Sequence, residues 1–148
     1  MTREAVKLGF IGFGNMGQAI ADGFLYTRTL EPSRMCACAV NREKLKKNTE
    51  ARGMRACRDS KEVVEQSDLV VLAVKPWMAG AVLEPLKGLF SGKVLWSVAA
   101  GVMFDDFEEM LGPGIHHITA IPCFPAAVGD GIYTCEKRHS LTEEEHAF

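Results

Sequence analysis

The stretch FIGFGNMGQAI, residues 10–20, decides how this chain folds. It places Gly12, Gly14 and Gly17 directly after the apolar run LGFI and just before a helical stretch. Gly12 permits a tight turn out of the strand, Gly14 has no side chain to hold a pyrophosphate away, and Gly17 lets the helix pack closely on the strand. The helix N-terminus offers an anion unpaired N–H groups and the positive end of the helix dipole. The spacing therefore predicts a dinucleotide-binding loop, with a glycine-rich structural turn as the alternative.

Short apolar runs alternate with helical stretches along the rest of the chain. The runs are continuously apolar, which is typical of parallel strands buried on both faces. Their alternation with helices predicts a Rossmann-like, doubly wound α/β fold, with a mostly parallel sheet and helices on both faces. Ser60 is expected to cap one helix, and residues 127–135 are expected to form one or two late strands. The expected strands are 7–11, 35–40, 68–74, 93–100 and 115–121, and the expected helices are 15–27, 42–52, 60–66, 78–90 and 104–111.

Composition indicates an ordinary globular chain of 148 residues. The formal net charge of −2 gives no reason to expect nucleic acid or an anionic membrane as partner. The five cysteines are odd in number, which favours reduced thiols and a cytoplasmic location over a disulfide framework. No metal site is expected, because the adjacent His116 and His117 would face opposite sides of a strand and no CxxC or HxxxH pair exists.

The end of the second expected strand bears on which dinucleotide binds. Folds that prefer NAD usually place a carboxylate there to bind the ribose 2′-hydroxyl. Here the strand runs into Asn41 and Arg42, and Glu43 follows only after them. An arginine can pair bidentately with a 2′-phosphate, so we expect NADP(H), with NAD(H) as the alternative cofactor. The alternative for Arg42 is a solvated position on the following basic helix.

Two later segments fall at strand ends, where ligands bind in such sheets. In AVKP, residues 73–76, Pro76 ends the strand and Lys75 can reach a ribose or phosphate, unless it is a solvated loop charge. In SVAAGV, residues 97–102, small side chains let a flat ring approach the backbone, unless they serve close helix–strand packing.

Together these segments resemble one enzyme family over nearly the whole chain. GFIGFGNMGQAI, SDLVVLAVKP, SVAAGV and IPCFPAAVGDG, in this order, look like the N-terminal cofactor domain of pyrroline-5-carboxylate reductase. The resemblance implies reduction of the cyclic imine 1-pyrroline-5-carboxylate to L-proline, in proline biosynthesis, by NAD(P)H. It also implies cofactor contacts from Gly12, Phe13, Gly14, Asn15, Met16, Gly17, Asn41, Arg42, Ser60, Ala73, Val74, Lys75, Pro76, Val98, Ala99 and Ala100.

One segment departs from the family pattern. The family usually reads Arg-x-Met-Pro-Asn-Thr-Pro near the nicotinamide, whereas residues 119–125 read TAIPCFP. Phe124 is bulky and apolar where a small polar residue is usual. No catalytic acid is assigned, and Cys123 is interpreted as structural because no histidine has a defined relation to it. The alternatives are another NADP-linked reductase, of the β-hydroxyacid dehydrogenase or deazaflavin-dependent type, and a non-catalytic dinucleotide-binding module.

The end of the sequence carries two staggered helix-start signals. Ser140 with Glu143, and Thr142 with Glu145, each have the form of a capping box. We expect a dinucleotide-binding domain over residues 1–135, and over residues 136–148 the start of a linker or helix leading to a missing C-terminal helical domain. The alternative is a frayed polar terminus. In the resembling family that domain makes a homo-oligomer and holds most of the substrate site, so the isolated chain is expected to be inactive.

Overall fold

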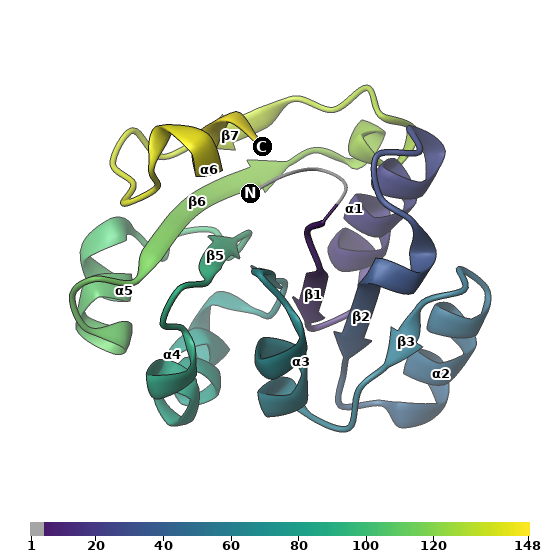
Figure 1. Ribbon diagram of the computed structural model, residues 1–148, viewed down its shortest axis with the longest axis horizontal. Coiled ribbons are helices and arrows are strands. Elements are labelled where there is room, and N and C mark those ends of the chain that lie inside the picture. The colour runs from purple at the N-terminus through teal and green to yellow at the C-terminus, as the bar shows by residue number, and fades with distance from the viewer. Residues whose placement is uncertain (1–4) are drawn as a thin grey trace.

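The computed structural model describes residues 5–148, which form a seven-stranded sheet in the order β3-β2-β1-β4-β5-β6-β7 (Figure 1). Strands β1 to β6 run parallel and β7 pairs antiparallel with β6. The mostly parallel, doubly wound sheet is therefore confirmed. The strands are β1 (Leu8–Ile11), β2 (Met35–Cys38), β3 (Arg55–Ala56), β4 (Leu69–Leu72), β5 (Val94–Ser97), β6 (His116–Pro122) and β7 (Tyr133–Cys135).

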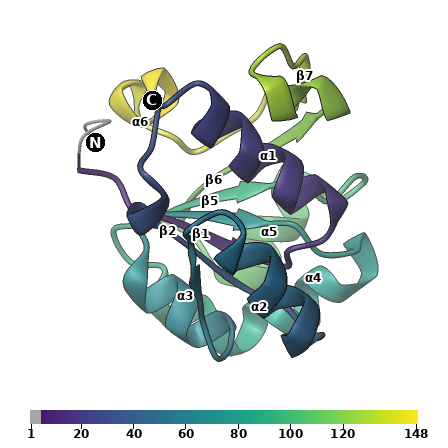
Figure 2. The ribbon, with the colours of Figure 1, turned by 90° about the vertical axis from the view of Figure 1, so that its right-hand side faces the viewer.

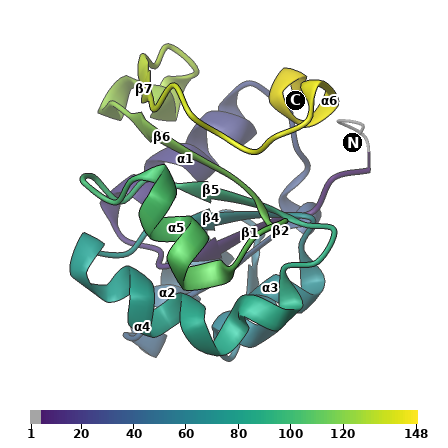
Figure 3. The same cartoon turned by 90° about the vertical axis from the view of Figure 1, so that its left-hand side faces the viewer.

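Helices cover both faces of this sheet, as expected. Figure 2 and Figure 3 show α1 on one side of the sheet and α3 and α4 on the other. The helices are α1 (Asn15–Tyr26), α2 (Arg42–Glu50), α3 (Ser60–Gln66), α4 (Ala79–Leu83), α5 (Phe104–Leu111) and α6 (Glu143–Ala147). Four short 3₁₀ segments connect them: η1 (Pro32–Arg34), η2 (Pro76–Met78), η3 (Glu84–Leu89) and η4 (Phe124–Val128).

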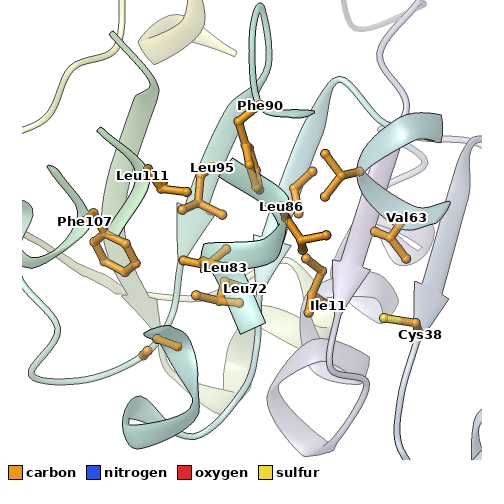
Figure 4. Close-up of a cluster of buried hydrophobic side chains, with 14 of the residues drawn as sticks. Ile11, Cys38, Val63, Leu72, Leu83, Leu86, Phe90, Leu95, Phe107 and Leu111 are labelled. Carbon is orange, nitrogen blue, oxygen red and sulfur yellow. The ribbon is translucent and has the colours of Figure 1, made fainter. Parts of the chain in front are cut away.

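Alternate residues of the buried strands feed two separate apolar cores. In β1, Phe10 packs with Ile20 of α1 and Leu45 of α2. Ile11 points into the opposite core, which holds side chains of α3, α4, η3 and α5 (Figure 4). Every residue of β1, β2 and β4 is buried, because helices cover both faces of these central strands.

The central strands are shorter than the apolar runs that predict them. β2 ends at Cys38, β4 at Leu72 and β5 at Ser97, so two or three apolar residues follow each strand. These residues leave the ladder at the same edge of the sheet. These apolar residues therefore belong to the loops that follow the strands and do not lengthen the strands.

Two local features differ from the sequence expectations. The helix expected over 78–90 is divided into α4 and η3, because Pro85 lacks an N–H and interrupts the helical ladder. The two-residue, exposed β3 carries no apolar run and is not predicted. Residues 127–135 hold one strand, β7, as expected, after a turn in which Gly129 has φ +73°.

The last helix begins at the second of the two expected signals. Thr142 accepts a hydrogen bond from the N–H of Glu145, and the Glu145 carboxylate accepts one from the N–H of Thr142. Ser140 does not cap a helix, because its hydroxyl donates to the carbonyl of Ile115, the residue directly before β6. Phe148 packs against the core beside α1, so this end of the chain is docked on the domain.

In the described part of the chain, no helix is long and apolar enough to cross a membrane.

Candidate functional site

The order of the strands places a crevice at one edge of the sheet. From β1 the chain moves outward to β2 and β3, then returns to the other side of β1 with β4. Where the direction reverses, the loops after β1 and β4 separate, and ligands bind outside the carboxyl ends of the strands there. A cleft of about 760 Å³ occupies this position. Its lining includes residues 12–16 after β1, Cys38 at the end of β2 with residues 39–40 after it, residues 58–60 after β3, residues 73–76 after β4, residues 98–100 after β5, and Phe124.

The glycine loop has the geometry that its spacing predicts. Gly12 has φ +88°, and a Cβ atom built on it would lie 2.4 Å from the Ala73 carbonyl oxygen. No heavy atom of residues 5–148 outside its immediate chain neighbours lies within 4 Å of a Cβ built on Gly14, which is the N-cap of α1. A Cβ on Gly17 would lie 3.0 Å from the Gly12 carbonyl oxygen. Gly12 and Gly17 therefore serve the turn and the packing, whereas Gly14 opens space in the cleft.

The other residues of this loop divide between core and cleft. The Phe13 ring is buried against Phe10, with 5.5 Å between the ring centroids, so Phe13 is at once a core side chain and part of the cleft lining. Gln18 donates from Nε2 to the Phe13 carbonyl at 3.2 Å, which holds the loop to the first turns of α1. Asn15 and Met16 begin α1 and line the cleft.

Backbone hydrogen bonds continue past the strand ends and fix the cleft walls. The Ala73 N–H donates to the Ile11 carbonyl at 2.8 Å, and the Val98 N–H donates to the Leu72 carbonyl at 3.1 Å. The expected residues from Ala73 to Pro76 and from Val98 to Ala100 all line the cleft. Apart from Lys75, the side chains at these two strand ends are small or apolar, which leaves the backbone open to a flat ligand.

Asn41 and Arg42 make hydrogen bonds within the chain. Asn41 caps α2, since its Oδ1 accepts a hydrogen bond from the Lys44 N–H at 3.0 Å. Arg42 donates from Nη1 to the carbonyl oxygens of Cys57 at 2.7 Å and of Arg58 at 2.8 Å. Neither residue is part of the cleft lining in the described chain. Arg42 instead ties the first turn of α2 to the loop between β3 and α3.

That loop carries functional candidates that sequence reasoning missed. Arg58 and Asp59 line the cleft next to Ser60, whose place in the lining matches the expectation. Asp59, not Ser60, is the N-cap of α3, and its Oδ1 accepts from the Glu62 N–H at 2.8 Å. The available signal was the spacing of Asp59 and Glu62, which marks a helix start directly after Arg58.

Glu62 organises the charges behind this loop. The Arg58 backbone N–H donates to its carboxylate at 2.8 Å, and the guanidinium groups of Arg58 and Arg55 contact the same carboxylate. These donors, the backbone N–H first, hold the pKa of the Glu62 carboxyl below its ordinary value. Glu62 is therefore the charged anchor of the loop.

The cysteines and two of the histidines, His116 and His117, make contacts within the fold. All five cysteines are free, and burial raises the pKa of Cys38 to about 11. Cys123 accepts a hydrogen bond at sulfur from the Ile132 N–H, 3.2 Å away. His116 contacts Glu145 and the buried His117 contacts Glu108, so the two rings have different partners. Among residues 5–148, no group of three or more His, Cys, Asp or Glu side chains is arranged to hold a metal ion.

Comparison with known proteins agrees with this geometry. The family described as "NADP oxidoreductase coenzyme F420-dependent" matches residues 7–101, which include the strands from β1 to β5 and the loops after them. The chain belongs to this family. Residues 7–101 hold every cleft segment named above except Phe124.

Over most of its length the chain is similar to curated pyrroline-5-carboxylate reductases. It is 38% identical to that of Treponema pallidum over 146 residues, which is 96% of this chain and 55% of the relative. It is 35% identical to that of Arabidopsis thaliana, over 97% of this chain and 52% of the relative. The chain thus spans about half the length of the curated relatives it matches, and the resemblance drawn from its motifs is confirmed.

Solved structures show the same likeness. The Plasmodium falciparum pyrroline carboxylate reductase, solved with NADP bound, matches with TM-score 0.83 and 29% identity over 97% of this chain and 52% of that one. The Coxiella burnetii pyrroline-5-carboxylate reductase matches with TM-score 0.85 and 28% identity over 97% of this chain and 54% of that one. Imine reductases match below 25% identity and share the fold.

Proposed function

We propose that this chain is the NADP(H)-binding half of a pyrroline-5-carboxylate reductase, which reduces the C=N bond of 1-pyrroline-5-carboxylate to give L-proline. The observation that carries the proposal is the 38% identity to such a reductase along 96% of the chain. The open space at Gly14, next to the N-terminus of the twelve-residue helix α1, supports it independently. A pyrophosphate needs close backbone approach and N–H donors, and this loop offers both.

The cleft residues divide among the parts of the dinucleotide. Gly12, Gly14 and the first residues of α1 would hold the pyrophosphate. The residues after β2 and β3, among them Ser60, would lie beside the adenosine. Those after β4 and β5, from Ala73 to Pro76 and from Val98 to Ala100, would lie beside the nicotinamide ribose and ring. The bound cofactor would supply the hydride for the reduction.

The chain's own contribution to such a reaction is positioning and exclusion of water. Three of the side chains proposed to lie beside the nicotinamide, those of Val98, Ala99 and Phe124, are apolar and offer no proton donor, and Lys75 is the charged side chain on the neighbouring loop after β4. Burial of the reacting ring against apolar groups fixes its face and keeps water away. A proton donor and the residues that bind the substrate carboxylate would then come from outside this wall, and no catalytic residue is assigned to the chain.

Two other functions would use the same cleft: reduction by a deazaflavin-dependent enzyme, and cofactor binding without catalysis. The family description names coenzyme F420, which is a deazaflavin, but the relatives that match nearly the whole chain are named for the imine reduction. A non-catalytic dinucleotide-binding module would bind the cofactor in the same cleft and support no reduction. Binding and turnover therefore have to be measured separately.

The test joins this chain to the remaining half of the Treponema pallidum reductase and follows NADPH consumption with 1-pyrroline-5-carboxylate. The proposal predicts NADPH binding by the 148-residue chain, little turnover by the chain alone, and proline formation by the chimera. A matched chimera carrying Gly14→Ala should lose that activity. Binding by the chain together with a folded but inactive chimera would favour the non-catalytic module. Robust proline formation by the chain alone would contradict the division between two halves.

Two further properties belong to the proposal. The five free thiols favour a reducing compartment, so we infer a cytoplasmic location. The similarity to the reductases leads us to expect a homo-oligomer in a protein that includes the other half.

A further inference from the structure

The cations that line the cleft lie on two different loops. Among residues 5–148, Arg58 after β3 and Lys75 after β4 are the basic side chains of the lining. Each follows a different strand, and β1 and β2 lie between β3 and β4 in the sheet. On the side of β2 and β3, where the adenosine half of a dinucleotide is proposed to lie, Arg58 is thus the lining cation.

Arg42, the arginine at the strand end, is already occupied in a different way. One of its terminal nitrogens, Nη1, donates to the carbonyl oxygens of Cys57 and Arg58 at 2.7 and 2.8 Å. Two bonds from a single guanidinium nitrogen to consecutive carbonyls hold this loop against α2. The residue whose backbone Arg42 binds is the same Arg58 whose side chain lines the cleft.

The surroundings of Arg58 leave its charge available to a ligand. Its side chain is 82% exposed, and its Nε lies 3.3 Å from a Glu62 carboxylate oxygen. Glu62 also contacts Arg55, so two guanidinium groups share one carboxylate. Asp59 brings a second carboxylate to the cleft, but its Oδ1 is used as the cap of α3. With Arg42 included, three arginines and the carboxylates of Asp59 and Glu62 belong to this loop and its contacts, so these groups carry an excess of positive charge.

We propose that Arg58 distinguishes NADP(H) from NAD(H) by pairing with the 2′-phosphate, and that Arg42 is a positioning residue that holds the Arg58 loop. The proposal rests on the proposed cofactor function of the cleft. Arginine suits the task because its planar fork binds phosphate oxygens bidentately. Val40, which also lines the cleft and is 92% exposed, offers an apolar surface on the same side for the adenine ring.

The experiment measures the affinities of the 148-residue chain for NADPH and NADH at one salt concentration, in wild type and Arg58→Gln. We expect Arg58→Gln to lower the NADPH/NADH affinity ratio about tenfold, chiefly through NADPH, because one charge-assisted pair is lost. Arg55→Gln is the matched control, since Arg55 carries the same charge and contacts the same Glu62 but does not line the cleft. Its ratio should stay at the wild-type value.

An unchanged ratio in Arg58→Gln would overturn the proposal. Equal weakening of both cofactors would do so too, because it would assign Arg58 to adenine stacking rather than to the phosphate. A wild type that binds neither cofactor would contradict the proposed function itself, so the two failures are distinguishable. The side chain is exposed, and a thermal melt of each variant checks that it is folded.

The role of Arg42 is tested in a double-mutant cycle. If Arg42 acts through Arg58, Arg42→Gln lowers the ratio in the wild-type background but not in the Arg58→Gln background. A further fall in the double variant would show that Arg42 reads the phosphate directly and would contradict its positioning role. Arg42→Lys replaces Arg42→Gln in the cycle if the glutamine variant does not fold, because one ammonium does not reproduce the guanidinium bridge.

Discussion

The two rims of the cleft differ in the chemical groups that form them. The rim after β1, β4 and β5 consists of backbone and, Lys75 apart, of uncharged side chains, with Gly12 packed against the Ala73 carbonyl. The rim after β2 and β3 carries the charged side chains of Arg58 and Asp59. Its loop is held from behind by Arg42, which binds two carbonyls, and by Glu62, which contacts two arginines. A backbone rim is fixed by the fold, whereas a charged rim depends on which side chain pairs with which. The first is therefore expected to be intolerant of added volume, and the second to tune affinity in smaller steps.

Gly12→Ala should have the largest effect on stability and on cofactor binding, because it adds a methyl group where the backbone rim is closely packed. The new methyl group would meet the Ala73 carbonyl oxygen at 2.4 Å in a residue held at φ +88°. We expect the free energy of unfolding to fall by about 2–5 kcal/mol and cofactor binding to be lost. Denaturant unfolding and calorimetry measure the two effects, and a variant of wild-type stability would contradict the close packing of this rim.

Gly14→Ala should separate binding from stability on the same rim. Its methyl group would meet no heavy atom of residues 5–148 within 4 Å, its immediate chain neighbours apart, and φ is −82°, so the fold carries no strain. We expect the free energy of unfolding to change by less than about 1 kcal/mol. NADPH affinity should fall about ten- to a hundredfold, because the methyl group occupies ligand space. An affinity equal to that of wild type would mean that no ligand approaches Gly14.

On the charged rim, Arg42→Gln should lower the free energy of unfolding by about 1–3 kcal/mol. It leaves the Cys57 and Arg58 carbonyls without the donor that they share in the native fold. Lys46→Gln is the control on the same helix, because Lys46 is exposed and forms only an i,i+4 ion pair with Glu50. Denaturant melts compare the two variants, and equal stabilities would show that the Arg42 bridge contributes nothing measurable.

The smallest effect expected is a dependence on pH that originates at Glu62. Its folded-state pKa is lowered from the ordinary value of 4.5, chiefly by the Arg58 backbone N–H. Its contribution to stability is therefore complete above pH 4.5 and is lost as the pH falls through the lowered folded-state value. Thermal melts between pH 3 and 7 should show a shallower acid loss in Glu62→Gln than in wild type. Parallel curves would contradict the anchoring role of Glu62.

The same contrast explains how much could be predicted from the sequence. The spacing of Gly12, Gly14 and Gly17 states a backbone requirement, so the loop, the fold and the backbone rim were all predictable. The partners of Arg42 were not, because several arginines lie within reach of one loop and only packing decides among them. β3 has two exposed residues and no apolar run, so the loop that carries Arg58 had no strand to mark it.

Elsewhere the differences have equally local causes. Serine is a common N-cap residue, so Ser60 is the expected cap of α3, but Asp59 precedes it and is the N-cap in the structure. Pro85 lies in an apolar stretch that reads as one helix and divides it into two segments. In both places a single neighbouring residue decides the outcome.

The measurement that tests the central claim most directly is titration calorimetry of the 148-residue chain and its Gly14→Ala variant with NADPH and NADH at one salt concentration. The cofactor cleft predicts that the wild type binds both, NADPH more tightly, and that the folded Gly14→Ala variant binds each at least about tenfold more weakly. No binding by the wild type, or equal affinities in the two proteins, would contradict a dinucleotide site at the glycine loop.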